Sequence, residues 1–172
     1  ARGFERVVYL GSGPLTGLAR ESALKLLELT AGKIVSYYDS SLGFRHGPKS
    51  VLNDRTLVIV YVSSDPYTRR YDLDIITELQ ATVPAGNLVA ISALPLSLGS
   101  EVRTFVFEEL SALDDAYLAV AFVTIAQVLA LSFSTQLGVT TDNPFPGGNV
   151  NRVVKGVQIY PLGSDGTRDS AS

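Results

Sequence analysis

The sequence predicts an α/β fold, a three-layer αβα sandwich around a five-stranded, parallel, flavodoxin-like sheet. The strongest observation is the run 56–62, which is apolar throughout and rich in β-branched residues. Such runs are typical of strands buried on both faces of a parallel sheet. A second apolar run, 7–10, ends at a glycine-rich turn and precedes a long stretch of helix-forming residues. Strands that alternate with helices along a chain indicate parallel pairing with helices on both faces.

The remaining elements follow the same alternation. We expect helices at 15–30, 68–82 and 114–137, and shorter strands at 33–38, 87–92 and 104–107. The most apolar part of the chain, 117–133, is interpreted as a buried helix. Glycine, proline and asparagine after residue 137 predict an irregular tail. We therefore expect a single domain over residues 1–163, with a polar, disordered end at 164–172.

The composition excludes several functional classes. The 172 residues carry a net charge of −3, and no basic cluster favours nucleic acid or an anionic membrane. The chain has no cysteine and one histidine, which argues against disulfides and zinc. No apolar run reaches the roughly 18 residues of a membrane span. The start, Ala1–Arg6, has no signal-peptide pattern, so we expect a cytoplasmic protein, and a chain without methionine is expected to be an excised domain or a processed product.

Three charged residues share one face of the first expected helix. Glu21, Lys25 and Glu28 follow i, i+4, i+7 spacing, which places them on one stripe. Such a stripe is often a solvated surface with weak ion pairs. Because this helix starts at the carboxyl end of a strand, the stripe could instead face a binding cleft there. A carboxylate beside a lysine can then serve as a base. The pattern leaves both interpretations open.

The single histidine, His46, lies in a glycine-flanked loop, Gly43–Pro48. Its side chain is the only one that titrates near neutral pH without a perturbing environment. It could be an acid or base on a loop, or a residue that caps the next helix. The pattern alone does not separate these roles.

The turn Gly11-Ser12-Gly13 follows the first strand and could bind an anion at a helix N-terminus. It could equally be a tight turn. Nicotinamide binding is a weaker alternative, because the third glycine of that motif is replaced by Thr16, although Asp39 could contact a ribose. In doubly wound sheets, ligands bind beyond the carboxyl ends of the strands, where the loops 11–13, 39–46 and 63–68 are expected.

Several motifs together resemble the sugar-isomerase (SIS) domain family. The segments 21–28 and 44–48 are similar to the second SIS domain of glucosamine-6-phosphate synthase, where Glu-x-Ala-Leu-Lys-x-x-Glu precedes Lys-His-Gly-Pro. The stretch 6–161 is more similar still to the tagatose-6-phosphate ketose/aldose isomerases, also described as galactosamine-6-phosphate deaminases. That similarity is carried by four segments: 37–40, 43–50, 62–69 and 151–157.

The resemblance implies a role for each matching residue. Glu28 corresponds to the base that moves a proton between C2 and C1 of the open-chain sugar. His46 corresponds to the histidine that opens the sugar ring, which in the synthase comes from the neighbouring subunit. Lys25 and Glu21 correspond to charged groups beside the base. Lys155 corresponds to a lysine in a C-terminal tail that folds over the sugar, and no metal or nucleotide cofactor is implied.

One segment departs from the family pattern. SIS domains that bind phosphate carry Ser-x-Ser-Gly-x-Thr after the third strand. Here Ser63 and Thr68 match that pattern and remain candidate substrate-binding residues with Gly11, Ser12, Gly13 and Glu21. Asp65 and Pro66 replace the middle serine and the glycine. A carboxylate repels phosphate and proline lacks an N–H donor, so this loop is not expected to hold the 6-phosphate.

The resemblance therefore implies a phosphosugar aldose–ketose isomerase or an amino-sugar-6-phosphate deaminase, which would convert galactosamine 6-phosphate to tagatose 6-phosphate and ammonia. The chain would be the C-terminal catalytic SIS domain, inactive on its own where the phosphate is held elsewhere. The expected partners are a phosphosugar, an N-terminal SIS domain and at least one further copy in a homo-oligomer. The alternative is a non-catalytic SIS module that senses a phosphosugar.

Overall fold

The computed structural model describes residues 3–148, 150 and 156–160. Its five strands form one parallel sheet in the order β2-β1-β3-β4-β5, which confirms the predicted α/β class and the flavodoxin-like order. The strands are β1 Arg6–Gly11, β2 Val35–Asp39, β3 Thr56–Tyr61, β4 Leu88–Ser92 and β5 Val102–Val106. The helices are α1 Pro14–Leu29, α2 Thr68–Gln80 and α3 Asp115–Gln136, with short 3₁₀ helices η1 Gly43–Arg45, η2 Gly47–Val51 and η3 Glu108–Leu110.

The centre of the sheet is buried on both faces. All six residues of β3 are buried, and β1 pairs with β2 on one side and with β3 on the other. A strand covered by helices on both faces needs apolar side chains at every position, which is why this segment lacks the usual alternation. The two edge strands, β2 and β5, are far more exposed.

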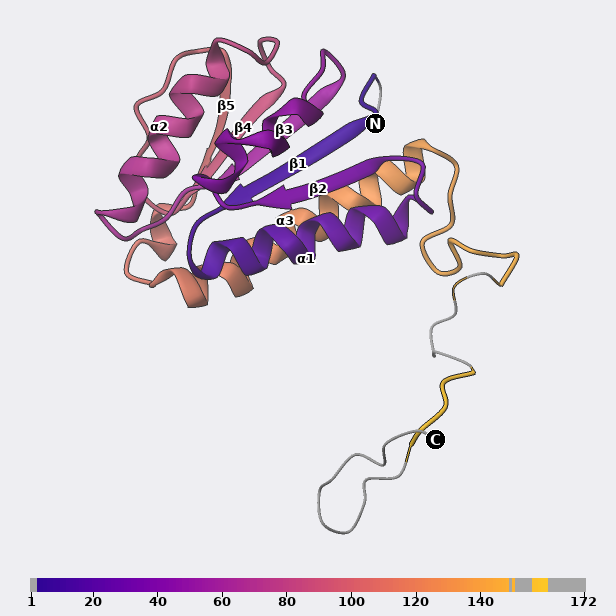
Figure 1. Ribbon diagram of the computed structural model, residues 1–172. Coiled ribbons are helices and arrows are strands. Elements are labelled where there is room, and N and C mark those ends of the chain that lie inside the picture. The colour runs from indigo at the N-terminus through magenta and orange to yellow at the C-terminus, as the bar shows by residue number, and fades with distance from the viewer. Residues whose placement is uncertain (1–2, 149, 151–155, 161–172) are drawn as a thin grey trace, which may run out of the picture.

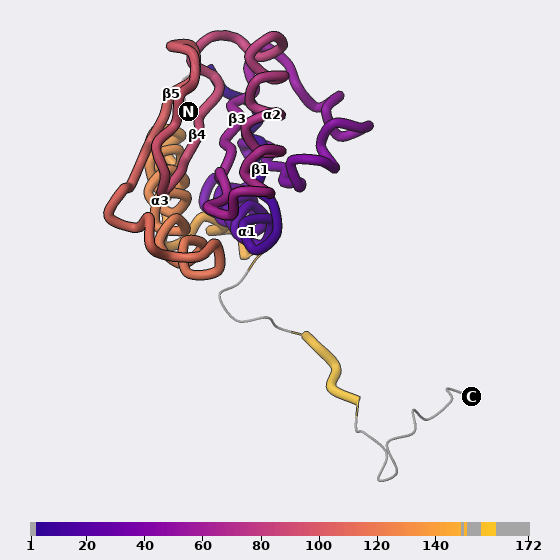
Figure 2. The backbone as a smooth tube through the Cα atoms, turned by 90° about the vertical axis from the view of Figure 1, so that its left-hand side faces the viewer, coloured from indigo at the N-terminus to yellow at the C-terminus, as the bar shows by residue number. Residues whose placement is uncertain are grey.

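Helices cover both faces of the sheet, as Figures 1 and 2 show. On one face α1 and α3 lie side by side and pack over Tyr9 and Tyr61, whose rings stack on each other. On the other face α2 packs with η1 over a second apolar cluster that includes Phe44. The three layers fix which functional side chains can meet.

Three local predictions differ from the structure. The fifth strand starts at Val102, two residues earlier than predicted. It is an edge strand whose polar residues are exposed, so its start lacks the apolar run that marks a buried strand. The predicted loop after β2 contains η1 and η2. The helix predicted to be buried, α3, is buried on one side only, and Val120 is 72% exposed. The apolar composition correctly predicted that α3 packs into the core, but it did not predict that the other side of the helix is exposed.

Candidate active site

The charged stripe on α1 is held together by ion pairs. The Lys25 Nζ donates to Glu28 Oε2 at 2.6 Å and lies 3.7 Å from Glu21 Oε1. The hydrogen bond to Glu28 is the main cause that raises the pKa of Lys25, so its ammonium stays charged over a wide pH range. The Lys25 side chain is 28% exposed and the Glu28 side chain 41% exposed. The pair is therefore partly desolvated and still open to a ligand.

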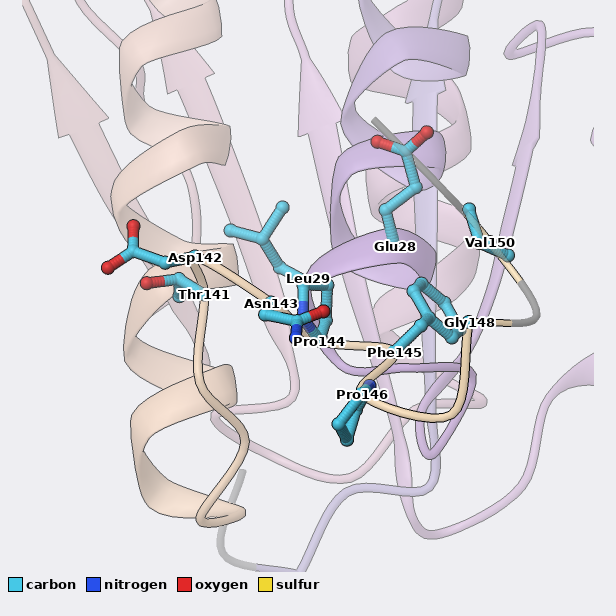
Figure 3. Close-up of a pocket in the computed structure, with 10 residues that line it drawn as sticks. All are labelled: Glu28, Leu29, Thr141, Asp142, Asn143, Pro144, Phe145, Pro146, Gly148 and Val150. Atoms are coloured by element: carbon cyan, nitrogen blue, oxygen red, sulfur yellow. The ribbon is translucent and has the colours of Figure 1, made fainter. Parts of the chain in front are cut away.

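Glu28 lines a pocket with a volume of about 690 Å³. Figure 3 shows how the loop after α3 passes around the C-terminal end of α1 and completes this pocket. That loop contributes hydrogen-bonding side chains, Asp142 and Asn143, and the ring of Phe145. A carboxylate with a cationic neighbour, beside polar groups and an aromatic ring, can bind and deprotonate a small polyhydroxy molecule. Lys155, expected over the site, lies outside the described residues.

The pocket lies at the amino edge of the sheet, not at the carboxyl edge that the sequence suggested. α1 starts at Pro14 beside the end of β1 and runs back along the sheet. Glu28, in its last turn, is about 21 Å further along the helix axis at 1.5 Å per residue. The glycine turn 11–13 and the loop 63–68 remain at the carboxyl edge. The structure therefore separates Glu28 from these candidate substrate-binding residues.

His46 and Glu28 belong to opposite faces of the sheet. His46 lies between η1 and η2, which pack with α2 through Phe44, whereas Glu28 lies on α1. The His46 side chain is exposed and does not cap η2, so the capping interpretation is not supported. Within one copy of the chain, these two residues are not brought together.

Ion pairs hold the two 3₁₀ helices around His46 against α2. Arg45 contacts Asp74 at 2.7 Å and Glu78 at 3.0 Å, and Lys49 contacts Glu78 at 2.5 Å. These contacts restrain the backbone on both sides of His46 while its ring faces solvent. A histidine held in this way can act on a group outside its own domain.

At the carboxyl edge of the sheet, a buried carboxylate accepts hydrogen bonds from three loops. Asp72 of α2 accepts from the hydroxyls of Ser12 at 2.6 Å and Ser41 at 2.5 Å, and from the Ser63 N–H at 2.9 Å. Burial raises the pKa of Asp72, and the hydrogen bonds from Ser12, Ser41 and Ser63 act in the opposite direction. The Ser12 hydroxyl of the turn after β1 is thus engaged inside the protein.

A second carboxylate has the same effect on the loop after β3. Asp115, the first residue of α3, accepts from the Ser63 hydroxyl at 2.5 Å and from the Ser64 N–H and hydroxyl, both at 2.8 Å. Asp65 accepts from the N–H groups of Tyr67 and Thr68, and the hydrogen bond from Thr68 lowers the pKa of Asp65. The hydroxyl and N–H groups that could bind a phosphate here already bind carboxylates.

Comparison with known proteins places the chain in a family. The SIS domain model matches residues 3–98, which is more than half of the chain. The chain belongs to the SIS domain family. Among residues that the structure describes, no group of three His, Asp or Glu side chains could hold a metal ion.

The SIS domain is similar over most of its length to larger proteins. A Streptomyces coelicolor relative is 53% identical over 158 residues, and the D-galactosamine-6-phosphate deaminase of Escherichia coli is 49% identical. The crystal structure of the tagatose-6-phosphate ketose/aldose isomerase from Escherichia coli has a TM-score of 0.79 at 44% identity, covering 92% of this chain and 40% of that one. The match to these two curated relatives covers 92% of this chain but only about 41% of the length of each relative.

Asp72 and Asp115 were missed by sequence reasoning. Asp72 is in phase with Ile75, Ile76 and Leu79, the residues that α2 buries, so its position already indicated a buried carboxylate. Asp115 follows the N-cap Asp114 and gave no comparable signal. In this SIS domain, both residues accept hydrogen bonds from the serine loop after β3.

Proposed function

We propose that this SIS domain carries out the proton-transfer chemistry of an amino-sugar-6-phosphate deaminase with aldose–ketose isomerase chemistry. The substrate is galactosamine 6-phosphate, and the products are tagatose 6-phosphate and ammonia. The observation that carries the proposal is the Glu28 carboxylate, paired with Lys25 at 2.6 Å and lining a pocket with Asp142 and Asn143. The names of the relatives supply the substrate class.

The reaction begins when His46 helps to open the sugar ring. Glu28 then removes the proton from C2 and returns it to C1, which converts the aldehyde into an enolamine and then into a C2 imine. Water adds to the imine carbon, and the C–N bond breaks to release ammonia and leave the ketose. Lys25 stabilises the carboxylate form of Glu28 before proton abstraction and the developing negative charge afterwards. Lys155 is proposed to act from the C-terminal tail.

The 6-phosphate is proposed to bind outside this chain. The hydrogen bonds from Ser12, Ser41 and Ser63 to Asp72 and Asp115 support this, because a phosphate at this edge would meet two carboxylates. The relatives extend well beyond the matched region, and a preceding SIS domain is the proposed phosphate site. Gly11, Gly13, Glu21 and Thr68 remain candidate substrate-binding residues of this chain.

The separation of His46 from Glu28 supports a shared site. We propose a homo-oligomer in which His46 of one copy reaches the Glu28 pocket of another. Two copies related by a two-fold axis would form two such sites at once. The proposed setting is the cytoplasm, and no metal or nucleotide takes part in the reaction.

The test is ammonia release from galactosamine 6-phosphate by the full-length polypeptide that contains this chain. Glu28→Gln is expected to lower kcat by at least about 100-fold, the scale of lost general-base catalysis. Glu109→Gln removes an exposed carboxylate from η3 and is expected to leave turnover unchanged. Binding of the sugar without turnover in the parent protein would favour the sensing module instead. Unchanged turnover in Glu28→Gln would contradict the role of this residue.

A further inference from the structure

The outward side of α3 carries no charge and exposes a stripe of mainly apolar residues, with the uncharged polar residues Gln127, Ser132 and Thr135 exposed beside it. Its exposed stripe, defined here as the α3 face, consists of five residues in successive turns. Spacings of three and four residues place them on one side of the helix. Tyr117 is 65% exposed, Val120 72%, Val128 61% and Leu131 48%. The full set is Tyr117, Val120, Thr124, Val128 and Leu131. No charged residue occurs in α3 after Asp115.

The exposed stripe does not belong to the buried core of the domain. α3 already packs onto the sheet through its opposite side, where Leu118, Phe122 and Phe133 are buried in the core. The helix on the other layer, α2, has the usual polar outward surface, where Arg70 and Asp74 are exposed. Exposed apolar patches that carry no charge often mark the sites where a protein binds a partner.

The chain enters the domain beside the C-terminal end of α3. The Phe4 ring, just before β1, stacks on Phe133 with ring centroids 6.5 Å apart. Lys33 Nζ also donates to the carbonyl of Leu137 at 3.5 Å. The segment before β1 and the C-terminal end of α3 therefore lie at the same end of the molecule. A polypeptide that continues before Gly3 therefore leaves the domain next to α3.

The curated relatives contain the polypeptide that could occupy this surface. The chain matches about 41% of their length, at their C-terminal part, so a large part of each relative precedes the matched region. The pocket around Glu28 lies at the same end of the molecule as Phe4 and the last turn of α3. A domain connected there is close to both the α3 face and the pocket.

We propose that the α3 face docks the part of the full polypeptide that precedes Gly3, through an apolar surface on that part. Docking would bury Val120 and Val128 and hold the preceding domain at a fixed position beside the Glu28 pocket. α3 is also long and apolar enough to span a membrane by length and composition. However, its inward side is packed against a sheet, so it cannot cross a bilayer without unfolding the core. This inference does not use the proposed reaction.

The test places the photoreactive residue p-benzoylphenylalanine at Val128 in the full-length polypeptide. The matched control carries it at Thr77, an exposed position on α2 on the opposite layer. After irradiation, denaturing gel electrophoresis separates cross-links within one polypeptide from those between two. Peptide mapping by mass spectrometry then identifies the cross-linked partner. A second placement at Tyr117 checks that the result does not depend on one position.

The expected result is efficient cross-linking at Val128 and Tyr117 that leaves the polypeptide at its monomer mass and maps to residues before Gly3. Thr77 is expected to give at least about tenfold less of this product. A band of twice the mass, mapping to α3 of a second copy, would overturn the proposal in favour of a copy–copy interface. Absence of cross-links to protein, or cross-links to lipid in the presence of phosphatidylglycerol vesicles, would also overturn it. None of these outcomes affects the ammonia-release test, so the two proposals fail separately.

Discussion

The ammonium of Lys25 lies 2.6 Å from Glu28 Oε2, one helical turn further along α1. Glu28 lies at the end of α1, where it lines a pocket together with described residues of the loop after α3. On an ordinary solvated helix, this contact would contribute only tenths of a kcal/mol to stability. The position of Glu28 in a pocket supports the proposed role of this carboxylate as a base, with the Lys25 ammonium as its fixed partner.

Replacement of Lys25 tests this role. Lys25→Met is expected to lower kcat by about 10- to 100-fold and to change KM far less, because it removes a charge that matters most in the transition state. Lys25→Arg keeps the positive charge and is expected to restore part of kcat. Steady-state ammonia release by the full-length protein measures both. A loss in Lys25→Met that appears only in KM would show that Lys25 serves binding alone.

Asp72 is expected to be a structural requirement at the carboxyl edge. Asp72→Ala leaves the Ser12 and Ser41 hydroxyls and the Ser63 N–H without their acceptor. Unsatisfied buried donors cost about 1–3 kcal/mol each, and hydroxyls can find other acceptors, so a loss of about 3 kcal/mol is expected. Chemical denaturation of the full-length protein measures it. A loss below about 1 kcal/mol would show that water replaces the carboxylate.

The pH dependence of stability tests the charge of Asp72. Burial raises its pKa in the folded state, so the folded protein holds this proton at a pH where the unfolded chain, with a pKa of about 4, has released it. Stability from this group is therefore greatest at low pH and falls as the pH rises from about 4 through the folded-state pKa.

The non-titrating variant Asp72→Asn provides the matched comparison. Its amide can accept from Ser63 and donate to the two serine hydroxyls, and it keeps the same shape. The free energy of unfolding of the parent, relative to Asp72→Asn, is expected to decrease between pH 4 and pH 7. A difference that stays constant with pH, or that grows in favour of the parent, would contradict the raised pKa.

The separation of His46 from Glu28 predicts complementation between copies. Full-length Glu28→Gln and His46→Asn are each expected to be nearly inactive. When both are co-expressed, mixed dimers contain one intact site, so about a quarter of the parent activity is expected for random pairing in a two-fold dimer. Activity no higher than that of the separate variants would show that both residues act within one copy.

The sequence was sufficient for the fold because its signals were local. The buried run 56–62 and the glycine turn after β1 are each visible within a few residues, and the alternation of strands with helices indicates a parallel sheet. The ion pairs of the α1 stripe were also predictable from its spacing, since Glu21 and Glu28 both contact Lys25.

The placement of the site was harder to predict because it depends on direction and on neighbours. A helix that starts at the carboxyl edge ends at the amino edge, so the spacing of the stripe located Glu28 on α1 but not at the correct edge of the sheet. The hydrogen bond from Ser63 to Asp115 joins residues that are 52 positions apart in the sequence, and no local sequence pattern predicts such a pair. The exposed side of α3 could not be predicted either, since composition does not distinguish a core from an interface.

The proton transfer itself gives the most direct test of the account. Galactosamine 6-phosphate deuterated at C2 is incubated with the full-length protein in ordinary water, and loss of deuterium from C2 is followed by NMR. The parent protein is expected to move this deuterium to C1 of tagatose 6-phosphate or to exchange it with solvent, and Glu28→Gln is expected to do neither. Removal of the C2 deuterium by Glu28→Gln at the parent rate would contradict the assignment of Glu28 as the base.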